Sequence, residues 1–141
     1  MSSRIFSAAN IGLNSHLIEV EADVSAGLPN FLIVGLPDAA VSEAKERVRS
    51  AIKNADLLFP RTKTTVNLAP ADLKKIGPSF DLPIAVAILT TRKLIKLKAE
   101  DQRAIFIGEL SLDGSLRPVN GTLSIAESLN KQGLKRIYLP Q

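Results

Sequence analysis

The sequence predicts an α+β fold: a mixed β-sheet with βαβ crossovers and a leading antiparallel hairpin. Two strand-like segments come first, at 4–12 and 16–24, and helical and strand-like segments then alternate toward the C-terminus. Alternating strands and helices favour crossover connections onto one sheet. A length of 141 residues fits one domain with one hydrophobic core.

The leading hairpin is predicted mainly from the second segment, His16–Val24. Apolar residues at 18, 20, 22 and 24 alternate with Glu19, Glu21 and Asp23, as in a strand with one buried and one solvated face. Asn14-Ser15 supplies turn chemistry between the two strands. The three carboxylates resemble a metal cluster, but no neighbour supplies a closing ligand, so we interpret them as a solvated face.

A first long helix is predicted from Asp38 to about Ala55, after a short apolar strand at Phe31–Val34. Asp38 has the position and chemistry of an N-cap. Apolar residues recur at helical spacing and form the expected buried stripe: Val41, Ala44, Val48, Ala51, Ile52 and Ala55. The opposite face mixes both signs of charge, which is typical of a solvated helix face.

The next strand is predicted at Thr62–Leu68, and a loop then leads to a helix over about Phe80–Leu94. Residues 82–89 leave no polar face, and a helix that is apolar all round is central in a fold. Ser79 directly precedes this helix. It is either an N-cap, which would stabilise the helix by about 1 kcal/mol, or a nucleophile.

The C-terminal part is predicted to hold a strand at Ala104–Leu110 and a two-residue hairpin turn at Asp113-Gly114. A helix over about Ser124–Lys131 follows, with Gly133 as its C-terminal glycine. A last strand is expected at Ile137–Leu139.

Composition excludes several kinds of site. The chain has no cysteine, and His16 is its only histidine, so thiolate and imidazole metal cages are excluded. Neither glycine-rich phosphate-binding motif, G-x-x-x-x-G-K-[ST] or G-x-G-x-x-G, occurs. The longest apolar run is too short to cross a bilayer, and no signal peptide is evident. We therefore expect a cytoplasmic protein with no membrane contact and no metal or cofactor in this domain.

Charge is distributed unevenly along the chain. Residues 1–60 carry five Lys/Arg and seven Asp/Glu, whereas residues 61–141 carry thirteen and seven. A basic half can mark a nucleic-acid surface, although a solvated lysine face is the commoner cause. The candidate DNA contacts are Lys74 and Lys75, in a loop that we expect to be exposed, and Arg92, Lys93, Lys96 and Lys98.

One set of motifs resembles the proteolytic domain of the ATP-dependent Lon proteases. The set consists of Gly77-Pro78-Ser79 before an apolar helix, Ile107–Val119, Gly121 and Gly133–Pro140. In that family the serine of the G-P-S string pairs with a lysine just after a glycine pair. Aligned without gaps, Asn120 and Gly121 fall on the glycine pair and Leu123 falls on the lysine.

This resemblance implies a serine without its catalytic base. Ile76 stands where Lon-type enzymes carry an acid, and Phe80-Asp81 replaces a small pair. A serine needs a neighbouring base to lose its proton at neutral pH, and a lysine in an exposed loop stays protonated. We therefore expect no catalysis, with Ser79 as a vestigial nucleophile and Leu123 at the position of the missing lysine.

A closer resemblance covers nearly the whole chain. Its strings are Phe6–Ala9, Val20–Pro29, Ile33–Val41, Glu46–Asn54 and Val66–Pro83. They look like the N-terminal domain of the magnesium-chelatase-like AAA+ ATPases, the YifB/ComM family. The resemblance implies a Lon-protease-domain-like fold (ribosomal protein S-five domain-two-like) in residues 1–141. An AAA+ ATPase module is expected to follow, outside this sequence.

The family resemblance also implies partners. ATP and Mg would bind in the ATPase module, which would assemble with neighbouring subunits into a hexameric ring. In the ComM branch such a ring drives DNA branch migration during recombination of incoming DNA. Three hypotheses stay open for this segment. It is a non-catalytic accessory domain for ring assembly or engagement of single-stranded or branched DNA, a Ser79-dependent Lon-type peptidase, or a protein–protein interaction domain only.

Overall fold

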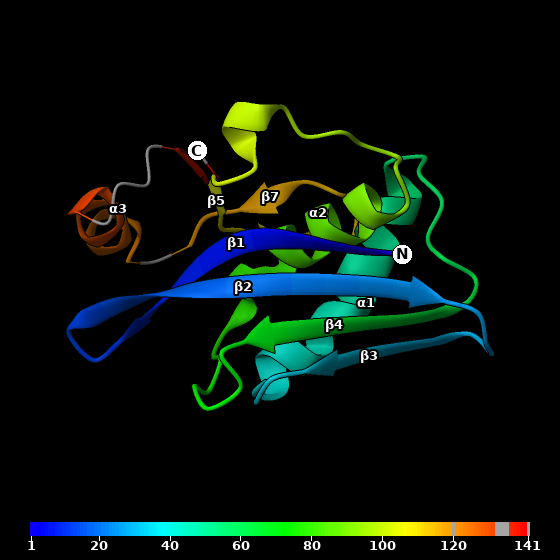
Figure 1. Ribbon diagram of the computed structural model, residues 1–141, viewed down its shortest axis with the longest axis horizontal. Coiled ribbons are helices and arrows are strands. Elements are labelled where there is room, and N and C mark those ends of the chain that lie inside the picture. Colours follow the sequence, from blue (N-terminus) through cyan, green and yellow to red (C-terminus); the bar gives the residue numbers. More distant parts are fainter. Residues whose placement is uncertain (120, 132–135, 141) are drawn as a thin grey trace.

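Figure 1 shows the computed structural model, which describes residues 1–119, 121–131 and 136–140, without the side chains of residues 122–124 and 129. The elements, in chain order, are β1 (Ser2–Ile11), β2 (Asn14–Ser25), β3 (Asn30–Val34), α1 (Ala39–Asn54), β4 (Lys63–Ala69), η1 (Pro78–Phe80), α2 (Asp81–Thr91), η2 (Ala99–Asp101), β5 (Ile105–Phe106), β6 (Glu109–Leu110), β7 (Leu116–Arg117), α3 (Thr122–Lys131) and β8 (Ile137–Tyr138). No helix in these ranges is long and apolar enough to cross a membrane.

The main sheet has the strand order β3-β4-β2-β1-β5-β8. β1 and β2 form the leading hairpin, and β2 also pairs antiparallel with β4. The pairs β3–β4, β1–β5 and β5–β8 are parallel. Helix α1 connects β3 to β4, and α3 lies in the connection from β5 to β8, as parallel neighbours require. The predicted α+β class, mixed sheet, crossovers and hairpin are therefore confirmed.

The two faces of this sheet are covered differently. Helices α1 and α2 pass behind the strands in Figure 1 and pack on the main core, in which Ile5, Val20 and Leu68 are buried. Ile125 of α3 packs instead with Ala8 in a smaller cluster. Because Ile5 and Ala8 lie an odd number of positions apart on β1, they point to opposite faces. The other face is therefore covered by α3 at one end only.

Helix α2 is the central helix, as its apolar sequence predicts. Its middle residues are buried without a break from Ile84 to Ile88. The hydroxyl of Ser3 on β1 donates to the Ala87 carbonyl oxygen at 2.6 Å, which fixes β1 against the helix. The helix ends at Thr91 rather than near Leu94, since Lys93 has a positive φ of 58°.

The start of α2 also differs from expectation. Ser79 lies inside η1, and the N-cap of α2 is Phe80, without a side-chain capping hydrogen bond. Of the two alternatives for Ser79, the N-cap is therefore wrong, because a 3-10 turn intervenes. The backbone of Gly108 fixes this turn instead. Its N–H donates to the Ser79 carbonyl oxygen at 3.0 Å, and its carbonyl oxygen accepts from the Leu82 N–H at 3.0 Å.

Two predicted turns are displaced. The β1–β2 turn is Gly12-Leu13, where Gly12 has a φ of 63°, and Asn14 already belongs to β2. The predicted strand 104–110 is divided between β5 and β6. β6 and β7 pair through Leu110 and Leu116, so residues 111–115 form the hairpin loop instead of a two-residue turn.

Candidate nucleic-acid interface

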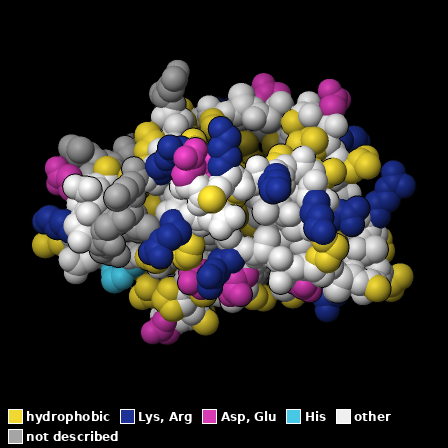
Figure 2. Space-filling model, turned by 45° about the horizontal axis from the view of Figure 1, so that its top comes forward, with side chains coloured by type: hydrophobic (Ala, Val, Ile, Leu, Met, Phe, Trp, Pro, Cys, Tyr) yellow, Lys and Arg dark blue, Asp and Glu magenta, His cyan; other side chains and the backbone are white. Residues whose placement is uncertain are grey.

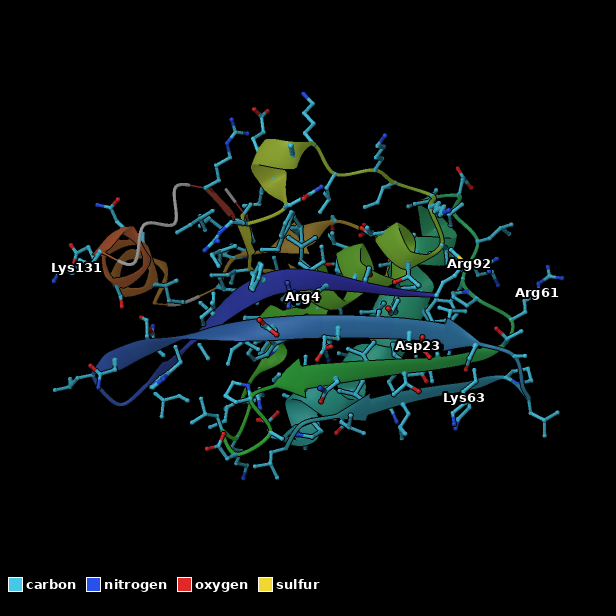
Figure 3. All side chains as sticks on the ribbon, viewed as in Figure 1. Arg4, Asp23, Arg61, Lys63, Arg92 and Lys131 are labelled. Carbon is cyan, nitrogen blue, oxygen red and sulfur yellow. The ribbon has the colours of Figure 1, made fainter. Side chains whose placement is uncertain are left out.

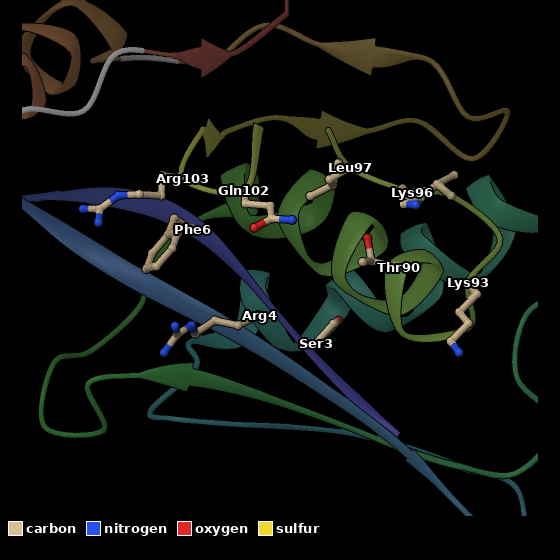
Figure 4. Close-up of a pocket in the computed structure, with 10 residues that line it drawn as sticks. Ser3, Arg4, Phe6, Thr90, Lys93, Lys96, Leu97, Gln102 and Arg103 are labelled. Carbon is tan, nitrogen blue, oxygen red and sulfur yellow. The ribbon is translucent and has the colours of Figure 1, made fainter. Parts of the chain in front are cut away.

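A groove of about 820 Å³ lies between the N-terminal half of β1 and the segment after α2 (Figure 4). Its lining residues come from three stretches of chain: Ser3, Arg4 and Phe6 from β1, Thr90, Lys93, Ile95, Lys96 and Leu97 from the end of α2 and the following loop, and Gln102 and Arg103 before β5. Among the residues that the structure describes, no acidic side chain lines the groove. The groove therefore favours an anionic ligand.

The cations are placed at opposite ends of this groove. Figure 4 shows Arg4 and Arg103 near Phe6 at one end, and Lys93 and Lys96 at the other. In the described part of the chain, Lys93, Lys96 and Arg103 form no ion pair. Figure 2 shows lysine and arginine side chains spread across the side that includes the top of Figure 1. Within the described residues no carboxylate pairs with Lys93, Lys96 or Arg103, so the charge of these three side chains is available to a polyanion.

The loop that carries the lysines is fixed by alternating apolar anchors. At the end of α2 the N–H of Lys93 donates to the Thr90 carbonyl oxygen at 3.0 Å, which closes the helix. Ile95 and Leu97 then pack against the main core, while Lys96 and Lys98 are exposed. An extended segment with this alternation turns its charged side chains to solvent.

Arg4 is held over an aromatic ring. Its guanidinium carbon lies 5.5 Å from the centroid of the Phe6 ring, within the range of cation–π contact. A guanidinium nitrogen also lies 3.7 Å from a carboxylate oxygen of Glu19, and both side chains are partly exposed. Such an exposed ion pair is weak, so Arg4 keeps most of its electrostatic attraction for a ligand.

The structure brings together only part of the predicted cationic set. Lys93 and Lys96 line the groove, whereas Arg92 and Lys98 are exposed outside its lining. Arg4 and Arg103 belong to the groove and were missed by the sequence prediction. Because Arg4 and Arg103 lie far apart in the sequence, no short sequence motif contains both. The pairing of Phe6 on β1 with Ile105 brings them together.

Lys75 contradicts the expectation of an exposed loop cation. Its side chain is fully buried, and its ammonium donates to the Pro70 carbonyl oxygen. Its backbone N–H donates to the Leu36 carbonyl oxygen at 2.9 Å, and its own carbonyl accepts from the Asp38 N–H at 2.9 Å. Burial lowers the pKa of the Lys75 amine below its ordinary value of 10.5. Lys75 therefore has a structural role, and its buried ammonium group cannot contact a polyanion at the surface.

Ser79 faces a separate and smaller cavity of about 170 Å³. Lys74, which is exposed, lines the same cavity, together with Ile76 and residues of β1. No hydrogen bond joins the Ser79 hydroxyl to a base within the described residues. Asn120 and the side chain of Leu123 lie outside the described part, so the position of the missing lysine stays a prediction.

The described residues contain no cluster of three or more histidine, cysteine, aspartate or glutamate side chains suited to a metal ion. Glu19, Glu21 and Asp23 instead lie along β2 on the face opposite the main core. There Glu21 accepts a hydrogen bond from the Asn67 amide at 3.1 Å. Glu19 pairs with Arg4, and Asp23 pairs with the N-terminal ammonium group of Met1, each at 3.7 Å.

A family model described as subunit ChlI of Mg-chelatase matches residues 20–141. The chain belongs to this magnesium-chelatase ChlI family. Among its relatives is YifB of Escherichia coli, 44% identical over 135 residues, which cover 96% of this chain and 26% of YifB. The competence protein ComM of Haemophilus influenzae is 44% identical over 137 residues, which cover 97% of this chain and 27% of ComM.

A more distant relative of this ChlI-family chain carries a name from DNA repair. The DNA repair protein RadA of Treponema pallidum is 31% identical over 104 residues, which cover 73% of this chain and 22% of RadA. The chain thus spans about a quarter of the length of the relatives that it matches. The resemblance to the magnesium-chelatase-like YifB/ComM proteins is therefore confirmed, and their activities as whole proteins enter only as proposals.

Proposed function

We propose that this segment is a non-catalytic N-terminal accessory domain of a cytoplasmic magnesium-chelatase-like AAA+ ATPase, and that it engages DNA. The main support for the proposal is the groove, which has cations at both ends and no acidic lining residue in the described part of the chain. Association with phosphates releases condensed counterions, which supplies most of the affinity of such surfaces. The names of ComM and of the DNA repair protein RadA agree with a DNA partner.

The proposal extends to the rest of the parent protein. An AAA+ module would bind ATP and Mg and form a hexameric ring with neighbouring subunits. ComM-like branch migration during recombination and transformation is the activity that we propose for that ring. In this arrangement the present domain would guide single-stranded or branched DNA toward the motor or help to assemble the ring.

The test is a charge-reversal series measured by fluorescence anisotropy with a labelled oligonucleotide at low salt. Replacing Lys93, Lys96 and Arg103 with glutamate should weaken binding by more than about tenfold, because several phosphate contacts are lost. The matched control reverses Lys53, Arg61 and Lys131, which are exposed and outside the groove. Figure 3 shows Arg61 and Lys131 at opposite ends of the molecule, away from Arg4. An equal loss in the control would show diffuse attraction and would contradict the proposal.

A Ser79-dependent Lon-type peptidase is the second candidate, since Ser79 and Lys74 line one cavity. We favour the non-catalytic reading because the one buried lysine of that loop, Lys75, donates to the Pro70 carbonyl oxygen. The third candidate, an interaction domain for proteins only, would be supported if the unmodified domain bound no DNA at low salt.

A further inference from the structure

We infer that the groove receives single-stranded nucleic acid, with one unstacked base against the Arg4–Phe6 pair. This inference rests on the proposed DNA engagement. It specifies that the strand is single and that one base binds at Arg4 and Phe6. The groove volume of about 820 Å³ lies within the range of pockets that enclose small organic groups. In a duplex the bases are stacked and paired, so only a single strand presents a free base to such a recess.

The Arg4–Phe6 pair provides the surface for stacking. Bases stack on aromatic rings and on guanidinium planes, and here the two planar groups lie 5.5 Å apart. The side chain of Arg4 is 59% exposed, so its outer side is open to the groove. A base on this pair would lie at the Arg4–Arg103 end of the groove, and the strand would continue toward Lys93 and Lys96 at the other end.

Gln102 is the side chain best suited to contact the edge of that base. The hydroxyl of Ser3 already donates to a carbonyl oxygen of α2, and that of Thr90 donates to the Val86 carbonyl oxygen at 2.7 Å. The amide of Gln102 is exposed and, within the described residues, has no hydrogen-bond partner. It lies between the two cationic ends in Figure 4. An amide both donates and accepts, so it can contact any base without strong selection.

A rival occupant is an acidic peptide. β1 pairs with β5 only through Phe6 and Ile105, so residues 2–5 have no strand on that side in the described structure. A peptide can add to a free strand edge through main-chain hydrogen bonds. That mode uses backbone groups and charge, and it has no need of the guanidinium plane of Arg4. The two occupants therefore respond differently to substitutions at Arg4.

The experiment compares three probes of equal length with the protein: a single-stranded oligonucleotide, its duplex, and a strand of abasic sites. We expect the ordinary single strand to bind most tightly, and the abasic strand to bind about fivefold or more weakly, since stacking of a base adds to phosphate attraction. Arg4→Lys keeps the charge and removes the plane. This substitution should lower the affinity for the ordinary strand by about fivefold or more. The affinity for the abasic strand should not change. Arg61→Lys, outside the groove, is the matched control.

Each result is decisive. Two results would contradict the proposed base-binding position: equal affinity for ordinary and abasic strands, or an equal effect of Arg4→Lys on the affinity for both strands. Neither result would contradict the proposed DNA binding. No binding of any probe at low salt would remove both proposals. Displacement of the oligonucleotide by a polyglutamate peptide at equal charge concentration, unaffected by Arg4→Lys, would assign the groove to acidic peptides. Gln102→Ala should reduce affinity for the ordinary strand only, and this surface change does not threaten folding.

Discussion

Arg47 on α1 and Asp81 at the start of α2 form a two-pronged ion pair inside the protein. Nε of Arg47 donates to one carboxylate oxygen of Asp81 at 2.6 Å, and Nη2 donates to the other at 3.1 Å. Asp81 is fully buried and also accepts from the Leu110 N–H at 3.0 Å. One carboxylate thus joins α1, α2 and β6, beside the turn that contains Ser79.

Removing either partner of this pair should strongly destabilise the protein. Asp81→Asn or Arg47→Met should lower the free energy of unfolding by about 3–5 kcal/mol, because the remaining group loses its buried partner. Urea titration followed by circular dichroism measures the change. The control is Glu43→Gln, which removes an exposed i,i+4 partner of Arg47 at 3.5 Å and should cost less than about 0.5 kcal/mol. Similar costs for both pairs would show that burial of Asp81 has no special effect.

Lys75 predicts a specific dependence of stability on pH. Its folded-state pKa is lowered by burial below 10.5, so the unfolded chain binds more protons between the folded and unfolded pKa values. Stability should therefore rise as the pH increases through this window toward 10.5. Lys75→Met should abolish that rise. Urea titrations at several alkaline pH values test it, with Lys74→Met, an exposed neighbour, as the control that should retain the wild-type slope.

The contrast between Lys74 and Lys75 shows what could be predicted from the sequence. The alternation of β2, the apolar α2 and the crossovers depend on periodic patterns, and these predictions are confirmed. Adjacent lysines in a loop have no such pattern. Which one is buried depends on the pairing of Lys75 with the strand-like segment at Pro37, a contact between distant parts of the chain. The failed N-cap prediction at Ser79 has a similar cause, since Gly108 fixes that turn from another element.

Gly35 is predicted to be intolerant of any side chain. Its φ is 103°, and an added Cβ would lie 2.1 Å from the Leu68 carbonyl oxygen, so backbone would have to move. Gly35→Ala should therefore cost at least about 2 kcal/mol. Gly12→Ala is the matched control. It also has a positive φ, 63°, but no atom within 4 Å of the added Cβ, and should cost about 1 kcal/mol. Thermal unfolding of the two variants separates the cost of a positive φ from the cost of the steric clash with Leu68. Equal losses of stability in both variants would contradict the predicted clash.

Ser79 should be dispensable for both stability and chemistry. Its hydroxyl makes no hydrogen bond within the described residues, and it does not cap α2. Ser79→Ala should therefore change the free energy of unfolding by less than about 0.5 kcal/mol. A serine-directed fluorophosphonate probe should not label the wild-type protein, because no neighbouring base takes the proton. Labelling that disappears in both Ser79→Ala and Lys74→Met would instead establish a serine–lysine pair.

The salt dependence of the proposed DNA binding should report the number of phosphates that the groove contacts. For single strands each neutralised phosphate contributes about 0.7 to the slope of the logarithm of affinity against the logarithm of salt concentration. Lys93→Met and Lys96→Met together should therefore reduce the slope by about 1.4, since neither lysine has an acidic partner in the described structure that would compensate. Arg92→Met, at an exposed neighbour outside the groove lining, should leave the slope within experimental error. If all three substitutions reduced the slope equally, the loop would attract DNA as a diffuse charge, and the geometry of the groove would have no part in binding.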